Sequence, residues 1–424
     1  MRIPLTYRFG ACALLLLFVA TVRANPSADG SAVSLNDAIA RTLERSPVLV
    51  AFDYQIEAQE GRALQSGLRP NPELRVSVED ALGTGALEGF DLAETTLSLA
   101  WVLERGKRER RVDAARAGVS LLEVDAEIRR LDAAAETARR FLDSLAIQER
   151  LVLSDDAIRL AEQTVTNVGQ RVRAGRTPEA DLARAEAELA RVRLDREDLG
   201  HELLSSNRRL AAQWGDTRPE FTRVRGGVNE LPTPGSFASL VARIDGNPTV
   251  ARYLSEKRLR EAELRLAAAE ARPDWQLSAG VRRLEQLNDQ ALVAGITIPL
   301  ATRNRNQGRI AEARARLAMA DADRTATRVQ IETQLFALHQ ELLHSLHRAA
   351  TLRDEILPRV QRALADTERA YAAGRYGYFE LRVVQAEVLA ARTALIEASI
   401  DAHRHVIEIE RLTGTTLSSS VAQP

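Results

Sequence analysis

The residues best suited to metal chemistry are the histidines of the second half of the chain. His339 and His344 are five positions apart, so on a helix their side chains differ by about 140° in direction and cannot share one ion. His344 and His347 could share a helix face, but histidines on a long exposed helix are usually solvated. His403 and His405 face different directions. We therefore expect no metal site.

Other catalytic constellations are missing from the sequence as well. It contains no phosphate-binding glycine loop and no dinucleotide fingerprint. Its single cysteine, Cys12, lies within the apolar stretch near the start of the chain, and a formal net charge of -1 gives no reason to expect a nucleic-acid partner. We expect a protein that is not an enzyme and needs no cofactor.

The first 24 residues have the pattern of a secretory signal peptide. Arg2 and Arg8 precede an apolar run over 9–22, and Ala24 is a small residue at the expected cleavage site. The run is shorter than the roughly 20 residues that a membrane-spanning helix needs. The sequence therefore predicts export, and a mature chain without thiols.

The rest of the chain is a tandem repeat. Motifs recur in the same order about 200 residues apart; the matching pairs begin at Ser46 and Asn247, Arg69 and Arg272, Arg111 and Arg309, Arg173 and Ala372, and Gly215 and Gly414. We expect a first repeat in residues 25–215, a linker rich in proline and glycine over 216–235, a second repeat in 236–414, and a tail over 415–424.

Each repeat shows the same succession of periodicities. A helix is followed by two segments with apolar residues at every second position, then by a very long helix and a shorter one with coiled-coil spacing. The expected helices cover 36–69, 105–174 and 178–214 in the first repeat and 237–272, 304–373 and 378–413 in the second; the β-hairpins cover 72–104 and 274–301. The fold class is mainly α with transmembrane β.

The lengths of these elements indicate how they are arranged. In each repeat the two shorter helices together match the long one, which spans on the order of 105 Å. They are therefore expected to stack end to end beside it. After the signal peptide no apolar run is long enough for a membrane helix, so any membrane part must be a closed β-barrel. Four strands cannot close; two chains would supply eight and three would supply twelve.

Two tryptophans support a membrane location for the hairpins. Trp101 is near the end of the second predicted strand and Trp275 is at the start of the third. Both would then lie at the same membrane interface, as anchors of an aromatic girdle. The alternative is that they are two ordinary buried tryptophans.

The order of the repeated motifs resembles that of TolC-type outer membrane efflux proteins. The resemblance rests on the turns Arg173-Ala174-Gly175-Arg176 and Tyr371-Ala372-Ala373-Gly374-Arg375 and on Leu412-Thr413-Gly414. The segments 103–108 and 299–309 look most like the cobalt–zinc–cadmium resistance branch. The family implies a homotrimer whose twelve-stranded β-barrel continues into a periplasmic α-barrel.

The resemblance also implies a function and partners. The expected protein is a passive conduit in the outer membrane, with a long periplasmic part, in a Gram-negative type of cell. It would carry heavy-metal cations within a tripartite system that includes a periplasmic adaptor and an inner-membrane proton-driven pump. The alternatives are that the chain is itself a periplasmic adaptor or a coiled-coil scaffold. Adaptors usually carry one helical hairpin flanked by β-rich domains, whereas two are expected here with the β-segments at the opposite end. A scaffold would leave the amphipathic β-hairpins and their tryptophans unexplained.

The resemblance assigns roles to particular residues at the helical turns. Gly175 and Gly374 are suited to the positive φ of a tight turn. The residues expected to contact the adaptor are Arg173, Gly175, Arg176, Asp181, Tyr371, Gly374, Arg375 and Glu380. In a trimer Asp366 and Glu368 would form rings of negative charge near the closed end of the tunnel, a pattern that favours cations; a solvated helix face is the alternative.

Overall fold

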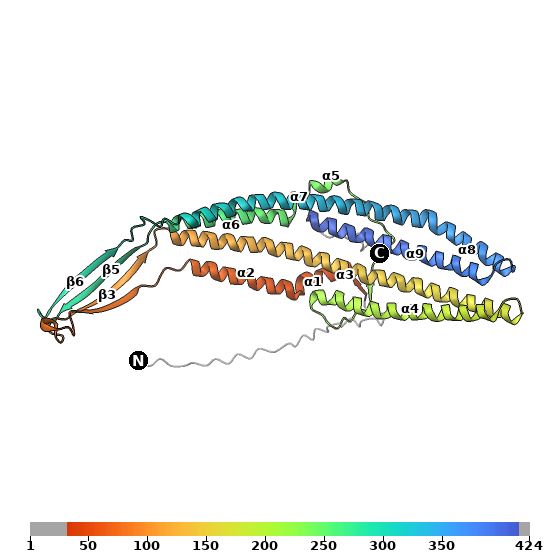
Figure 1. Ribbon diagram of the computed structural model, residues 1–424, viewed down its shortest axis with the longest axis horizontal. Coiled ribbons are helices and arrows are strands. Elements are labelled where there is room, and N and C mark those ends of the chain that lie inside the picture. Colours follow the sequence, from red (N-terminus) through yellow and green to blue (C-terminus); the bar gives the residue numbers. More distant parts are fainter. Residues whose placement is uncertain (1–31, 415–424) are drawn as a thin grey trace, which may run out of the picture.

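Two helical hairpins run side by side along the molecule, and a sheet extends from one end of them (Figure 1). The structure is a computed structural model that describes residues 32–414. The predicted signal peptide and the predicted tail lie outside the described residues. Among residues 32–414, no helix is both long and apolar enough to cross a membrane.

The first repeat contains four main helices: α1 (Leu35–Arg45), α2 (Pro47–Ser66), α3 (Lys107–Arg173) and α4 (Glu179–Ala211). The helix expected over 36–69 is in fact two. Pro47 is the first residue of α2 and Ser46 before it is extended, because the proline ring disfavours a helical conformation in the preceding residue. A capping box of Ser34 and Asp37 starts α1.

The second repeat contains α5 (Phe237–Val241), α6 (Pro248–Glu270), α7 (Gln307–Thr351), α8 (Leu357–Ala372) and α9 (Tyr378–Thr413). The helix expected over 304–373 is interrupted by one π-helical segment, Leu352–Ile356. The first repeat spans 64 positions from Arg111 to Gly175, whereas the second spans 65 from Arg309 to Gly374. A π segment accommodates one additional residue within a helix, so it absorbs this difference.

The four hairpin strands form one antiparallel sheet, which confirms the expected fold class. They are β2 (Glu73–Glu79), β3 (Glu94–Leu103), β5 (Trp275–Leu284) and β6 (Asp289–Thr297), in the order β2-β3-β5-β6. The central pairing of β3 with β5 joins the two repeats. Within residues 32–414, β2 and β6 each have a neighbour on one side only.

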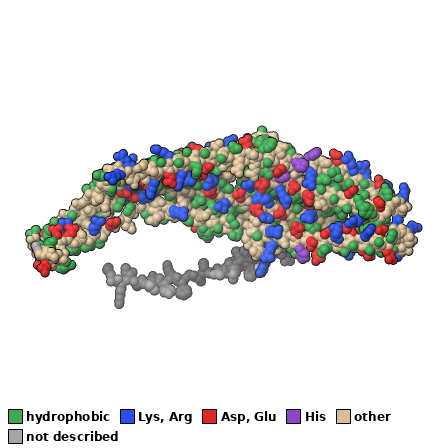
Figure 2. Space-filling model, in the orientation of Figure 1, with side chains coloured by type: hydrophobic (Ala, Val, Ile, Leu, Met, Phe, Trp, Pro, Cys, Tyr) green, Lys and Arg blue, Asp and Glu red, His purple; other side chains and the backbone are tan. Residues whose placement is uncertain are grey.

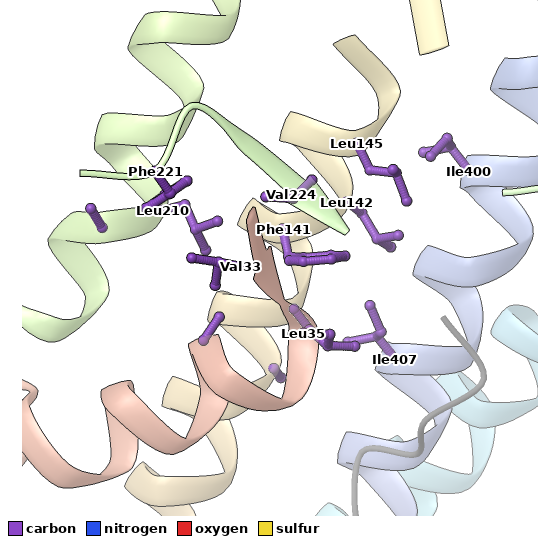
Figure 3. Packing of buried hydrophobic residues seen from close by; sticks show 14 of the residues in the cluster. Val33, Leu35, Phe141, Leu142, Leu145, Leu210, Phe221, Val224, Ile400 and Ile407 are labelled. Carbon is purple, nitrogen blue, oxygen red and sulfur yellow. The ribbon is translucent and has the colours of Figure 1, made fainter. Parts of the chain in front are cut away.

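The segment expected to be a linker takes part in the core. Its strand β4 (Arg223–Arg225) pairs in parallel with β1 (Ala32–Ser34). Phe221 and Val224 from this segment pack with Phe141 and Leu142 of α3 and with Ile400 of α9 (Figure 3). The high proline and glycine content indicated an irregular course for the segment but did not reveal that its apolar residues are buried.

Candidate membrane-facing sheet and helical tips

One face of the four-stranded sheet is apolar and exposed. Residues that pair across neighbouring strands point to the same side, and alternate residues in a strand share a side. By this rule one face collects Leu74, Val76 and Val78 of β2, Leu97, Leu99, Trp101 and Leu103 of β3, Trp275, Leu277, Ala279 and Val281 of β5, and Leu292, Ala294 and Ile296 of β6. Leu292 is 90% exposed. So large an apolar surface calls for a membrane or a protein partner.

The opposite face of the sheet is polar. Arg282 of β5 forms an ion pair with Glu94 of β3, with 2.6 Å between nitrogen and oxygen, and its Nε donates to the Thr96 hydroxyl at 3.1 Å. Small residues such as Ser98 and Gly280 occupy neighbouring positions. A sheet that is apolar on one side and hydrogen-bonded on the other suits a wall between lipid and water.

The two predicted anchor tryptophans lie on the apolar face, at the end of the sheet next to the helices. Trp275 pairs directly with Leu103, and Trp101 is two residues earlier in the same strand. Trp101 is 40% exposed. Trp275 is half-buried beneath the guanidinium of Arg105, which lies 4.7 Å from its ring centroid. Their role as membrane anchors remains a prediction.

The two helical tips have the same turn geometry. Gly175 and Gly374 have φ of 68° and 75°. In the first tip the Arg176 amide donates to the Arg171 carbonyl and the Gly175 amide donates to Val172, both at 2.9 Å. The second tip repeats both bonds at 2.9 Å one repeat later. This is the Schellman arrangement, in which a left-handed glycine closes the helix end.

The two tips are held together by a buried cluster that sequence reasoning missed. The Arg171 guanidinium lies over the Tyr371 ring at 4.5 Å from its centroid, and its Nη1 donates to the Tyr371 carbonyl. Tyr378, Val168, Ala185 and Leu381 complete the cluster. Tyr371 is only 5% exposed, and its side chain joins α8 to α3. Its expected contact with an adaptor remains a prediction.

The other predicted tip residues divide into exposed and structural groups. Arg173, Arg176 and Arg375 are exposed. The Glu380 carboxylate accepts from the Gly377 amide at 3.0 Å and so caps α9, whereas Asp181 is partly buried and lies 3.9 Å from Arg184. Glu380 therefore serves the fold of the tip, and the adaptor contacts of Glu380 and Asp181 remain predictions.

The two predicted aperture acids occupy different settings on α8. Both Asp366 and Glu368 are exposed. Asp366 pairs with Arg369 one turn later, whereas Glu368 lines a polar groove with Arg176 and Arg171. Whether they form rings remains a prediction.

The histidines occupy both exposed and buried positions. His344 and His347 are exposed, but His339 is buried with its Nε2 3.0 Å from the Gly235 carbonyl oxygen, and His403 is 0% exposed. Among residues 32–414, no three His, Cys, Asp or Glu side chains come together in a way that could hold a metal ion.

The fold defines a class of protein. It matches the outer membrane protein VceC from Vibrio cholerae with a TM-score of 0.71 and 18% identity over 91% of this chain and 97% of that one. The outer-membrane channel OprN gives 0.74 and 18% identity over 90% of both chains, and CusC gives 0.67 and 17% identity over 90% and 92%. The architecture is that of the TolC-type channels.

The sequence identifies the family. The model of the outer membrane efflux protein family matches residues 38–216 and 243–415, so this chain belongs to that family. It is 25% identical to the cobalt-zinc-cadmium resistance protein CzcC of Cupriavidus metallidurans over 86% of each chain. It is 26% identical to the nickel-cobalt-cadmium resistance protein NccC of Alcaligenes xylosoxydans xylosoxydans over 69% of this chain and 66% of that protein.

Proposed function

We propose that the chain is one subunit of a homotrimeric channel in the outer membrane, and that it conducts heavy-metal cations outward without transforming them. The observation that carries this proposal is the four-stranded sheet with an exposed apolar face. In water such a surface is a liability, whereas in lipid its exposure is favourable. The helical hairpins then extend from the membrane as the wall of a periplasmic tunnel.

Three chains fit the sheet better than one or two. Strands β2 and β6 present free backbone groups that lipid cannot satisfy, so each must pair with another chain. Two chains would give eight strands, whose interior is filled by side chains, whereas three give twelve and leave room for a lumen. Fractionation tests this proposal: trimers that dissociate only on heating should occur in the outer membrane, and a soluble monomer would refute it.

The relatives named for cobalt, zinc, cadmium and nickel resistance support heavy-metal cations as the cargo. A strain that lacks this gene should grow less well than its parent on cadmium, cobalt, zinc or nickel salts, and the intact gene should restore growth. Dyes and detergents serve as the comparison. Sensitivity to dyes alone, with unchanged metal tolerance, would contradict the cargo but not the channel.

We propose further that the tips contact a periplasmic adaptor, which couples the channel to an inner-membrane proton-driven pump. Arg173, Arg176 and Arg375 are exposed near the two glycine turns and are available for acidic groups of such a partner. Replacing Gly374 with leucine places a bulky side chain on a residue whose backbone has a positive φ. The variant should abolish export while trimers persist. Unchanged export in this variant would argue against the tip contact.

The proposed acidic rings need a separate measurement. Asp366→Asn and Glu368→Gln channels should show reduced cation selectivity in planar bilayers, most clearly at low salt where charges are least screened. Identical selectivity would assign both acids to a solvated helix face. The adaptor and scaffold alternatives are less favoured, since neither accounts for the apolar sheet opposite the tips.

A further inference from the structure

A groove lies where the sheet meets the helices. It is lined by the end of α6, the segment after β6 and the start of α3, among them Lys107, Arg272, Pro299, Leu300, Arg303 and Asn304. Figure 2 shows Lys and Arg side chains gathered around this junction on the face drawn. The proposed channel function leaves this concentration of positive charge without a role.

The positive charge at the junction exceeds what the local acids neutralise. Asp274 pairs with Lys107 at 3.0 Å and Glu270 pairs with Arg309 at 3.2 Å. Within residues 32–414, Arg272 and Arg303 have no ion-pair partner, and both are exposed. The segment 299–309 contains three arginines and no acid. The side chains of Arg272 and Arg303 are therefore available to bind an external anion in the groove.

Two long helices add to this positive potential. Helices α3 and α7 both begin at the junction, after Gly106 and Asn306, which have φ of 84° and 58°. Neither residue caps its helix with a side chain. The first amides of a helix and its dipole favour a negative charge near its start.

The groove is also apolar on the side next to the sheet. Leu300 is 82% exposed, and Ile298 and Leu103 are exposed beside it along the chain and in the sheet. Arg105 stacks over Trp275, at the position where the apolar face of the sheet ends and the cationic side chains of the groove begin. An occupant must therefore be anionic at one end and apolar at the other.

We propose that this groove binds an acidic phospholipid, with the headgroup phosphate against Arg272 and Arg303 and the acyl chains along Leu300 and the apolar face of the sheet. This inference rests on the proposed function, because it requires the sheet to lie in a membrane. It goes further by selecting the lipid: a phosphatidylglycerol is preferred over a zwitterionic phosphatidylethanolamine. Inorganic phosphate has the charge but lacks the chains that Leu300 would contact.

Native mass spectrometry of the full-length trimer in detergent tests the preference. With equal amounts of phosphatidylglycerol and phosphatidylethanolamine, the wild-type trimer should retain the first about tenfold more, and the double variant R272Q/R303Q should lose that preference. The matched control R208Q/R324Q removes two exposed arginines of α4 and α7 away from the sheet and should keep it. Equal retention of both lipids by the wild type would overturn the inference.

Three further measurements keep the result unambiguous. The variant R272K/R303K retains the charge and should retain the preference even if the glutamine variant assembles poorly. Millimolar inorganic phosphate should not displace the lipid; displacement would reduce the groove to a phosphate site and overturn the lipid assignment. Conductance of the same trimers in planar bilayers tests the channel itself, so conducting trimers without lipid preference would refute this inference alone.

Discussion

His403 is a buried ionisable side chain at the centre of the molecule. It lies on α9 and is 0% exposed. Burial lowers the pKa of His403, and the backbone of Val228 and Glu230, in the segment between the repeats, acts in the opposite direction with a smaller effect. The neutral imidazole is therefore the form that the folded chain prefers.

The lowered pKa of His403 predicts a loss of stability in acid. Well above the unfolded-state pKa of about 6.5, His403 is neutral in both the folded and the unfolded chain, so it does not lower the free energy of unfolding. As the pH falls below this value the unfolded chain takes up the proton first and the free energy of unfolding decreases. The thermal midpoint of wild-type trimers should fall more steeply between pH 7 and 5 than that of His403→Gln; parallel curves would contradict this.

Gly280 is fixed by backbone contact within the sheet. A Cβ at this position would lie 2.3 Å from the Leu97 carbonyl oxygen and 2.6 Å from the Ser98 Cβ. Because β3 and β5 join the repeats here, the strands cannot separate without breaking the sheet. Gly280→Ala should cost about 3 kcal/mol and reduce the yield of heat-dissociable trimers. Gly308→Ala, where nothing lies within 4 Å, is the control and should assemble normally.

The positions of single residues at the tips were predictable from the sequence, but the directions in which their side chains point were not. Sequence periodicity located both glycine turns, since each ends a long helix. Whether Arg171 faces a partner or Tyr371 depends on how α8 of one repeat packs against α3 of the other. No local pattern contains that information, because the two residues are 200 positions apart.

At the scale of elements, the sequence predicted the helices and hairpins well because their periodicities are long and regular. It missed the breaks before Pro47 and Pro248, where proline starts a new helix within an apparently continuous pattern. The pairing of β1 with β4 was also missed, since three-residue strands are too short to show alternation. The π segment did leave a signal, the one additional residue in the second repeat.

The π segment predicts which deletions the long helices tolerate. Deleting Arg353 and replacing Pro358 with alanine should leave a continuous α-helix with Tyr371 still in register, because the π turn holds one surplus residue. Trimers should assemble with near-normal stability. Deleting Ser154 from the uninterrupted α3 should instead rotate everything after it by about 100° and prevent assembly. Urea unfolding of both variants makes the comparison, and equal damage would refute the assignment.

At the scale of the whole molecule, the two sheet edges predict contacts between chains. Strands β2 and β6 are on opposite edges of one sheet, so a cysteine in each can meet only across two chains. In a Cys12→Ser background, Val76→Cys combined with Leu292→Cys, Ala294→Cys or Ile296→Cys should give covalent dimers and trimers on oxidation in one of the three combinations. Each single variant is a control, and monomers throughout would refute edge pairing.

The parallel pairing of β1 with β4 sets an order of events in time. Residues 32–34 find their partner only when residues 223–225 are present, about half a chain later. When the chain is delivered from its first residue onward, β1 has no strand partner while α1 to α4 emerge. Once β4 has emerged and paired with β1, the helices of the first repeat can pack together before the second repeat is complete. The central strand pair of the sheet forms later than the pairing of β1 with β4, because β3 must wait for β5. The apolar surface is thus assembled only after the helices α1 to α4 of the first repeat have emerged.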